Sequence, residues 1–505
     1  MIARATFLFA LIPTVALAQA DAARAAASIT EADVRRRIFI IADDSMGGRD
    51  TPSRGLEVTA QYLAREFERM GLKPAGDGSS FFQRYPIRLQ SIDPAASTIA
   101  FAEQGESRAV LRFSEDARLL NGSPLRPVVT HELAVGGGPI GPETEFDRSE
   151  VAGKALVWAA DWRTGGLNTG QVLIAAASAG ATLVIIPFNH ESTFVRLGGQ
   201  VANIVKAESV GWPAVIGIRE SALLAAIPSA AATLEAARTA PQARVEAAPG
   251  WTTTTSMAFT KDERHEVPNV VGIVPGTDPA LRHEFVAISA HFDHVGSRCR
   301  GVTPADSICN GADDNGSGTT GLLELAEAFA HPDAKPKRSV LFVAVSGEER
   351  GLWGSEYYAT NPTVPLDKIV ANINMDHLGR NWRDSIVVIG REHSELGALV
   401  DQVAVANRQL GVGVLPDQWP KERIYYRSDH YNFARHGVPI LFFTNGFHPD
   451  YHAVTDTPDK IDAEKQARVV RLIFHTALTV ANRAERPRWH PESERTIVRR
   501  RPVVP

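Results

Sequence analysis

The chain has 505 residues, of which 44% are hydrophobic and 22% charged, and its 53 Lys and Arg against 58 Asp and Glu leave a net charge of −5. These values are typical of globular proteins and exclude disordered, collagen-like and disulfide-dense chains, and the length predicts two or three domains. Because the chain is mildly acidic and has no long basic run before its last residues, we exclude nucleic acid as a partner.

The N-terminal residues resemble a secretion signal. Arg4 precedes an apolar run, Phe7 to Ala18, which ends in the small-x-small sequence Ala16-Leu17-Ala18, the pattern of a cleaved signal peptide. This run is shorter than the ~20 apolar residues that cross a bilayer, and we find no other uninterrupted apolar stretch of that length. We therefore predict a signal peptide over residues 1–18, a mature protein that is periplasmic or secreted, and no membrane span.

The first half of the mature chain predicts a helical segment followed by a β-rich module. Residues 29–70 have a largely helical pattern that ends at Gly71, a typical helix stop. Short apolar segments broken by Gly and Pro follow, and then a strand, an Ala-rich helix and a second strand over residues 153–187, which indicate a small α/β module. Residues 236–255 contain two prolines and four consecutive threonines, which favours a connection between domains.

The second half alternates strands and helices, which predicts an α/β fold with a mostly parallel, doubly wound sheet. We expect strands at residues 267–274, 284–290, 338–346, 369–375, 385–389 and 438–443, and helices at 318–330 and 462–484. The predicted organisation is a first segment of the main domain over 19–114, a smaller β-rich α/β insert over 115–250, the second segment over 251–485 and a disordered basic tail over 486–505.

Polar residues stand where several of these apolar strands end, which is where open α/β sheets place their ligand sites. The strand before His291 leads into His291-Phe292-Asp293-His294, the next into Ser346-Gly347-Glu348-Glu349, and the third into Asp376-His377. The last strand leads to His448 and His452, and a Gly-rich turn with Asp313 and Asp314 opens the helix at 318–330.

Imidazoles and carboxylates without thiolates suit Zn²⁺ or another borderline divalent ion, and this set is large enough for two metals that share one Asp. Two metals can hold a bridging hydroxide and polarise a carbonyl. His291 and Asp293 are two residues apart, so on an extended segment they face the same way, and Asp293 can accept the ring N–H of His291. Of the adjacent Glu348 and Glu349, one can bind metal while the other moves a proton.

The ordered motifs are similar to those of the di-zinc metallopeptidase family 28, which includes secreted leucyl aminopeptidases and glutamate carboxypeptidases. The motifs are His291-x-Asp293, Gly311-Ala312-Asp313-Asp314-Asn315-Gly316-Ser317-Gly318, Gly347-Glu348-Glu349-Arg350-Gly351-Leu352-Trp353-Gly354-Ser355, Asn374-Met375-Asp376, Ser428-Asp429-His430 and Tyr451-His452. The resemblance implies a zinc-peptidase α/β/α sandwich, a peptide substrate and two zinc ions per chain. The insert resembles a protease-associated domain, and we leave open whether it contacts substrate.

The resemblance also implies a role for each motif residue. His291 and Asp376 would bind one zinc, Glu349 and His452 the other, and Asp314, which lies three residues before Ser317, would bridge them, with a cis peptide to Asn315. Glu348 would be the general base, Asp293 would orient His291, and Tyr451 would donate to the oxyanion. His448 is the main rival to His452, which we prefer because Thr455-Asp456-Thr457 follows it.

These residues predict an exported, di-zinc exopeptidase, and we favour an aminopeptidase with Glu348 as general base. A carboxypeptidase or dipeptidase on the same site is the alternative, and Arg380, Arg427 and Asp429 are candidates for binding the substrate terminus.

A receptor-like binding protein is disfavoured because all five expected ligands and the base are present. The motifs Gly-x-Ser-x-Gly and His-Glu-x-x-His are absent, which argues against a serine hydrolase and a helical zincin. The sequence leaves the oligomeric state open.

The only two cysteines, Cys299 and Cys309, lie close together in the sequence. In an oxidising compartment outside the cytosol we expect them to form a disulfide. A free buried pair is the alternative.

Overall fold

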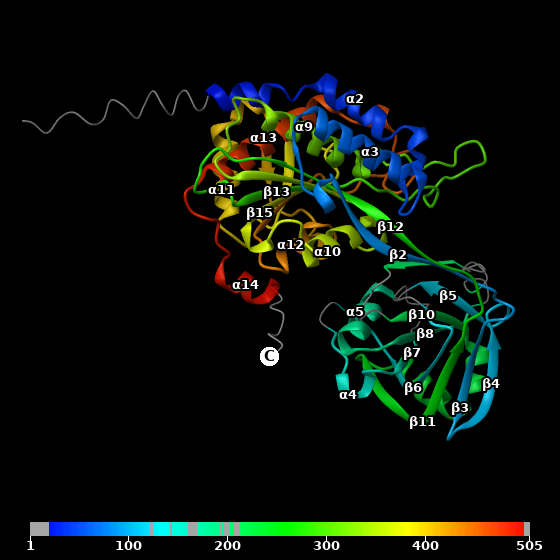
Figure 1. The fold of residues 1–505 in the computed structure, drawn as a ribbon. Coiled ribbons are helices and arrows are strands. Elements are labelled where there is room, and N and C mark those ends of the chain that lie inside the picture. Colours follow the sequence, from blue (N-terminus) through cyan, green and yellow to red (C-terminus); the bar gives the residue numbers. More distant parts are fainter. Residues whose placement is uncertain are drawn as a thin grey trace, which may run out of the picture. The chain divides into compact units, whose positions relative to one another are not determined.

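The chain forms two compact units in the computed structural model, which we call body 1 (residues 1–85 and 267–505) and body 2 (residues 86–266) (Figure 1). The structure describes residues 20–121, 125–141, 144–159, 169–190, 194, 202–206 and 213–498. The predicted signal peptide over 1–18 lies outside the described residues. Among the helices of the described part, none is long and apolar enough to cross a membrane.

Body 1 is built on a mixed sheet whose strand order is β17-β16-β18-β15-β13-β14-β12-β2, with β1 paired to β12. Its four central strands run parallel to one another: β18 (Ile440–Thr444), β15 (Ile369–Met375), β13 (Phe285–His291) and β14 (Ser339–Val345). Around them lie β17 (Gly413–Leu415), β16 (Ser385–Ile389), β12 (Phe259–Val274), β2 (Phe82–Ile92) and β1 (Lys73–Pro74). Strands β2 and β12 continue along the chain across the boundary of body 2.

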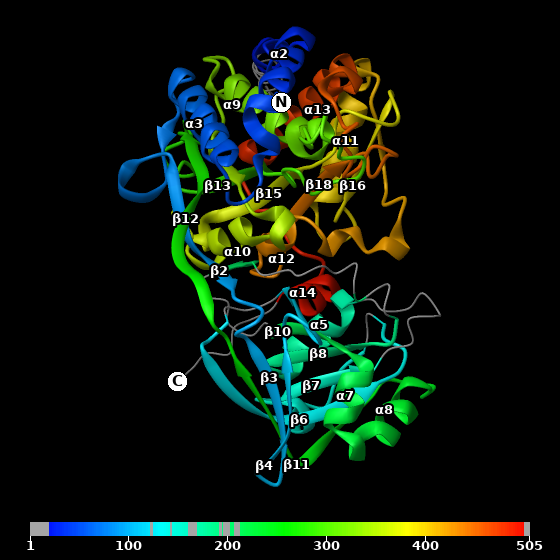
Figure 2. The same cartoon turned by 90° about the vertical axis from the view of Figure 1, so that its right-hand side faces the viewer.

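The central strands are buried almost throughout, because helices cover both faces of the sheet (Figures 1 and 2). One face is covered by α2 (Glu31–Ile41), α3 (Arg54–Arg69), α9 (Gly318–Ala330), α11 (Leu396–Ala406) and α13 (Ala463–Asn482). The other is covered by α10 (Trp353–Thr360) and α12 (His430–Ala434). Burial on both faces explains why these strands are continuous apolar runs rather than alternating ones. The α/β fold with a doubly wound, mostly parallel sheet is confirmed.

The N-terminal helices begin and end where their sequence signals indicate. The Thr30 side chain accepts a hydrogen bond from the backbone N–H of Asp33 at the start of α2, and Ser53 does the same for Leu56 at the start of α3. Both side chains satisfy N–H groups that the first helical turn leaves free. Past the end of α3, Gly71 has φ 80°, a left-handed conformation that favours glycine.

Body 2 contains a second sheet, in the order β4-β3-β11-β6-β7-β8-β10-β5. Its parallel centre consists of β6 (Val128–Gly137), β7 (Ala155–Ala159), β8 (Leu183–Phe188) and β10 (Ala214–Arg219). The antiparallel strands are β3 (Thr98–Glu103), β4 (Glu106–Arg112), β5 (Ala117–Asn121) and β11 (Arg244–Ser256), and β9 (Ala202–Lys206) pairs with residues 87–91 of β2. The helices are α4 (Arg148–Val151), α5 (Thr169–Ala179), α7 (Glu220–Ala226) and α8 (Ala231–Arg238). Two apolar clusters form the core, with Val157 in one and Trp158 in the other.

The boundaries of body 2 differ from the predicted insert of 115–250. Strands β3 and β4, which we assigned to the first segment of the main domain, pair within the sheet of body 2. The expected connection over 236–255 is wrong, because most of it is β11, which lies between β3 and β6. Alternate side chains of β11, Trp251, Thr253 and Thr255, are buried, and a register shift after Ala248 accommodates the Pro-Gly pair within the strand.

Residues 486–498, which we assigned to a disordered tail, are ordered. Helix α14 (Pro491–Ile497) buries Ile497 against body 1. Trp489 donates its indole N–H to the backbone oxygen of Gly437, and Arg488 pairs with Glu395 at 2.7 Å. Aromatic and ionic contacts therefore hold this segment, and the remaining tail residues lie outside the described part of the chain.

The expected disulfide between Cys299 and Cys309 is present, with a Cα–Cα distance of 6.1 Å. It closes a loop between β13 and α9. Cys309 lies just before the turn that opens α9.

Candidate metal centre

The carboxyl ends of the four parallel strands of body 1 bring the polar motifs together. His291 is the last residue of β13, Asp376 follows β15, and Glu348 and Glu349 follow β14 after a two-residue turn. The loop after β18 supplies His452, and Asp314 belongs to the turn that opens α9. Because parallel strands end at the same edge of a sheet, side chains far apart in the sequence meet there.

The turn before α9 is shaped to present Asp314. The peptide bond from Asp314 to Asn315 is cis, as the family resemblance implied. The Asn315 side chain donates to the backbone oxygen of Met375 and accepts from the N–H of Gly318. Gly311 has φ 55°, and a Cβ there would lie 2.3 Å from the backbone oxygen of Asp314, so only glycine fits. These contacts hold the turn against the end of β15.

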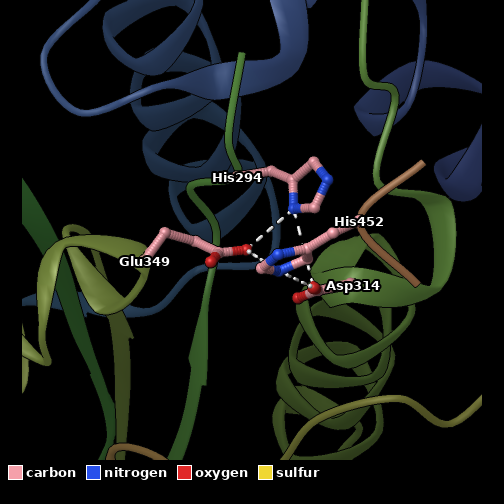
Figure 3. A group of neighbouring side chains, drawn as sticks. All are labelled: His294, Asp314, Glu349 and His452. Atoms are coloured by element: carbon pink, nitrogen blue, oxygen red, sulfur yellow. Dashed lines mark hydrogen bonds and ion pairs between the residues drawn. The ribbon is translucent and has the colours of Figure 1, made fainter. Parts of the chain in front are cut away.

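One group of side chains encloses the Oδ2 atom of Asp314 (Figure 3). The Nε2 atom of His452 lies 3.0 Å from Asp314 Oδ2 and 3.2 Å from Glu349 Oε1. His294 points its Nδ1 atom at the same two oxygens, at 3.7 Å and 2.9 Å (Figure 3). We call Asp314, Glu349 and His452 half-site 1.

A second group encloses the other oxygen of Asp314. The Nε2 atom of His291 lies 3.6 Å from Asp314 Oδ1 and 3.4 Å from Asp376 Oδ1. The Nε2 atom of His377 faces the same two oxygens, at 3.9 Å and 3.6 Å. We call Asp314, His291 and Asp376 half-site 2. Asp314 thus belongs to both half-sites, through one oxygen each.

These atoms fit cations better than they fit one another. Asp376 Oδ1 and His452 Nε2 are buried and have no hydrogen-bond partner among the described residues. Separations of 3.4–3.9 Å from His291 and His377 to the oxygens of Asp314 and Asp376 are longer than ordinary hydrogen bonds. Ligands ~2.0–2.2 Å from one Zn²⁺ stand at about this distance from each other. The donor set therefore suits two borderline divalent ions on either side of Asp314.

The clustered charges shift the pKa values of the carboxyl groups in opposite directions. Burial raises the pKa of Asp314, but the positive charges of His377 and His294 outweigh it and hold that pKa well below its ordinary value. Burial raises the pKa of Glu348 well above its usual range, against the lowering effect of His291. Asp314 is thus kept ionised, whereas Glu348 has the higher proton affinity, although both lie in the same cluster.

Glu348 lies beside half-site 2, in one group with His291 and Asp376. Its Oε2 atom is 4.0 Å from His291 Nε2, and its backbone N–H donates to Asp293 Oδ1 at 3.1 Å. Asp293 also accepts a hydrogen bond from the Thr51 hydroxyl, and burial raises its pKa to about 7. The Asp293 carboxylate is 3.7 Å from His291 Nδ1, whereas the backbone oxygen of Asp293 is nearer, at 3.2 Å. The contact of hydrogen-bond length to His291 is therefore made by the main chain.

A cavity in body 1 opens onto this cluster. Its wall includes Asp314, Glu348, Glu349, Asp376 and His377, together with Tyr451, Arg427, Ser428, Thr444, Gly446 and the apolar side chains Ile424, Phe442 and Phe447. Tyr451 stacks on His452, with ring centroids 4.0 Å apart. A ligand in this cavity would contact the carboxylates of both half-sites and an apolar surface.

Arg49, in the segment between α2 and α3, makes hydrogen bonds to the loop after β13 and to the turn before α9. Its guanidinium is fully buried and donates hydrogen bonds to four backbone oxygens. The acceptors are the oxygens of Ile41, Phe292, Asn310 and Gly311. Burial lowers the pKa of Arg49 to about 10, so it remains charged at neutral pH.

Residues 269–477, which contain every side chain of both half-sites, match the model of peptidase family M28. The chain contains a peptidase family M28 domain. The matched range covers the sheet of body 1 from β12 to β18 and most of α13. The recognition made from the motifs is thereby confirmed.

The M28 domain is similar to several named proteins. The chain is 24% identical over 322 residues to aminopeptidase YwaD of Bacillus subtilis, which covers 62% of this chain and 60% of that protein. It is 30% identical over 204 residues to a probable zinc metalloprotease of Leptosphaeria maculans, covering 36% and 45%. The chain thus spans less than two thirds of each of these relatives. The solved aminopeptidase from Aneurinibacillus sp. strain AM-1 shares the fold, with a TM-score of 0.53, 19% identity, and coverage of 92% and 97%.

The remaining candidates of the M28 domain lie in different surroundings. His448, the rival to His452, faces Asp313 at 3.3 Å instead of Asp314. Arg427 lines the cavity, whereas Arg380 is paired with Asp450 at 2.8 Å. Asp429 is fully buried, and neither carboxylate oxygen has a hydrogen-bond partner within the described residues.

Sequence reasoning assigned no role to His294 and His377, although both lie in the polar segments noted at the strand ends. His294 follows His291 by three residues, and His377 directly follows Asp376. The signal was their place at the strand ends, beside residues that we did assign. The family's ligand set, carried over by motif with one imidazole per metal, left these two side chains out.

Proposed function

We propose that this chain is an exported di-zinc aminopeptidase that hydrolyses N-terminal residues from peptides. The observation that supports it most is the pair of half-sites that share the buried Asp314 carboxylate, with Glu348 beside them and a cavity in front. His291 and Asp376 would hold one ion and Glu349 and His452 the other. Bound there, two zinc ions lower the pKa of a water molecule and polarise a carbonyl group.

Glu348 is the proposed general base. It lines the cavity and stands 4.0 Å from His291, at the edge of half-site 2, so it can reach a water held near the ions. Its carboxylate accepts the proton of the attacking water and then delivers it to the leaving amine. Asp293 holds the backbone N–H of Glu348 and so positions the base as well as the neighbouring His291.

Tyr451 is the proposed oxyanion donor. Its ring stacks on His452 and contacts the tilted ring of Phe447, whose centroid is 4.8 Å away. Burial raises the pKa of Tyr451 above its ordinary value, so the phenol keeps its proton and can donate it in a hydrogen bond. A donor fixed beside half-site 1 stabilises the negative oxygen that develops on the attacked carbonyl.

The similar proteins and the cavity wall favour an aminopeptidase. Of the four carboxylates that line the cavity, Asp314, Glu349 and Asp376 are proposed metal ligands, which leaves Glu348 free. Two of the similar proteins, from Bacillus subtilis and Arthroderma benhamiae, are named as an aminopeptidase and a probable leucine aminopeptidase. The apolar wall formed by Ile424, Phe442 and Phe447 fits an uncharged side chain next to the scissile bond.

One observation favours a carboxypeptidase or dipeptidase instead. Arg427 lies on the cavity wall, over the ring of Phe447, and its partner Glu422 is 3.6 Å away at the exposed rim. A guanidinium in this place can bind a substrate carboxylate.

Two further assignments stay predictions: body 2 as a protease-associated domain, and the signal peptide over 1–18.

The test is metal content by plasma emission together with hydrolysis of aminoacyl-anilides, N-acetylated peptides and dipeptides by the zinc-loaded protein. We expect two zinc ions and anilide cleavage, and a turnover about 10²–10⁴-fold lower in Glu348→Gln with its zinc retained. Glu392→Gln, the same change at an exposed carboxylate, serves as the control. Cleavage of acetylated peptides or of dipeptides alone would move the assignment to a carboxypeptidase or dipeptidase, and a protein without stoichiometric zinc would contradict the proposal.

A further inference from the structure

The arrangement around Asp314 contains more imidazoles than the five proposed ligands require. Half-site 1 has one histidine, His452, and half-site 2 has one, His291. The structure adds His294 to the first and His377 to the second. We propose that His294 and His377 are additional metal ligands, so that each half-site binds its ion through two imidazoles and two carboxylates. This inference rests on the proposed two-metal centre but not on peptidase activity.

The position of His294 matches that of His452. Both point a ring nitrogen at Asp314 Oδ2 and Glu349 Oε1, and their rings are 5.5 Å apart and nearly perpendicular (Figure 3). The four atoms all lie within 4.8 Å of one another. They therefore surround one point, where a cation would contact all four, and His294 faces that point rather than solvent.

His377 repeats this relation in half-site 2. Its Nε2 atom faces Asp314 Oδ1 and Asp376 Oδ1, the two oxygens that His291 Nε2 also faces. Distances of 3.6 Å and 3.9 Å from His377 to these oxygens are not hydrogen bonds, but they fit two ligands of a common ion. The donor types on the two sides of Asp314 are thus the same: one carboxylate oxygen of Asp314, one further carboxylate and two imidazoles.

The backbone supports His377 in this position at some cost. Its φ is 56°, a left-handed value that non-glycine residues rarely adopt, and His452 has φ 50°. Such conformations persist where the surroundings require them, often at functional sites. Behind the ring, Asp313 Oδ2 is 3.7 Å from His377 Nδ1 and 3.3 Å from His448 Nε2, and Asp313 Oδ1 accepts from the N–H of Gly379. At 3.7 Å the Asp313 carboxylate faces the Nδ1 atom of His377 without a hydrogen bond to it.

A four-ligand half-site has specific chemical consequences. Two nitrogen and two oxygen donors favour Zn²⁺, Co²⁺ or Ni²⁺ over Mg²⁺, Ca²⁺ and Mn²⁺, which prefer oxygen. Two additional protein ligands also make release of the ions slower. His377 lines the cavity, so it would hold its ion from the substrate side and narrow the space left for water.

X-ray absorption at the zinc edge tests this directly, because the outer-shell scattering of imidazole counts histidine ligands. On the full zinc-loaded protein we expect a mean of about two imidazoles per zinc, and about 1.5 in either His294→Asn or His377→Asn. His331→Gln, a histidine at the far end of α9, is the matched control and should leave the count unchanged. Each ligand variant should also release zinc to a chelator at least about tenfold faster than the wild type.

The wild-type count alone decides the matter if a variant fails to fold. A mean of one imidazole per zinc, with two ions bound and activity intact, overturns the inference and leaves the proposed function standing. Absence of stoichiometric zinc from the wild type overturns both. Two imidazoles per zinc in a protein that cleaves no peptide would support the inference and contradict the proposed function.

Discussion

Bodies 1 and 2 are both built around four parallel strands with antiparallel strands at the edges, yet their chemistry differs. Within the described residues, every group of side chains that could hold a metal belongs to body 1. His291 ends β13 of body 1, and Glu348 and Asp376 follow β14 and β15, whereas β6 of body 2 ends in glycines and β10 leads into α7. A parallel sheet offers a place for a site, and the residues at the strand ends decide whether one is built.

Removal of the carboxylate that the two half-sites share should have the largest effect on the chemistry of body 1. Asp314→Asn takes the charge from both half-sites at once, and we expect loss of at least one ion and a fall in turnover of about 10³-fold or more. Metal analysis and anilide hydrolysis measure both effects. Asp306→Asn, at an exposed loop position, should change neither. Full metal content and activity in Asp314→Asn would show that the two half-sites do not depend on a common bridge.

The opposite result is expected in body 2, where a substitution should affect stability and not chemistry. Trp158 is fully buried beside Phe146, with ring centroids 4.9 Å apart. Trp158→Ala should lower the free energy of unfolding of body 2 by about 3–5 kcal/mol, as a shift of its thermal transition. Zinc content and turnover per folded molecule should stay at wild-type values, as in Trp382→Ala, which removes a partly exposed tryptophan. A loss of zinc would contradict the independence of the site from the core of body 2.

Much of body 1 could be predicted because its strands are continuous apolar runs between polar turns. The bounds expected for β15, β16 and α9 match the structure residue for residue. The roles of His294 and His377 could not be predicted, because which nitrogen faces Asp314 depends on backbone angles such as the φ of 56° at His377. In body 2, the Pro-Gly pair in β11 indicated a linker, whereas long-range pairing with β3 and β6 makes that segment a strand.

Arg49 allows the support of the loops to be tested apart from metal binding. Its guanidinium donates to main-chain oxygens and not to a proposed ligand side chain. Arg49→Lys keeps the charge but cannot donate to four backbone oxygens. We expect a loss of about 2–3 kcal/mol in unfolding free energy and weaker zinc retention in a chelator titration. The exposed Arg35 on α2 provides the control, as Arg35→Lys. Unchanged zinc retention in a destabilised Arg49→Lys would mean that the loops keep their shape without it.

The smallest expected effect is a pH dependence of stability. Burial lowers the pKa of His430 to about 3, and its Nε2–H donates to the backbone oxygen of Tyr425. Between pH 6.5 and 3 the unfolded imidazole binds a proton that the folded one does not, so stability falls as pH decreases, by up to about 1.4 kcal/mol per pH unit. Urea midpoints at pH 5 and 7.5 should therefore differ less in His430→Gln than in the wild type. Equal differences would show that His430 is not the buried neutral group.

The most direct test of the central claim, two ions on either side of Asp314 at the sheet edge of body 1, is anomalous diffraction at the zinc edge from crystals of the zinc-loaded protein. We expect two peaks about 3.5–4 Å apart, one beside Glu349 and His452 and the other beside His291 and Asp376. A single peak, or peaks away from Asp314, would contradict it.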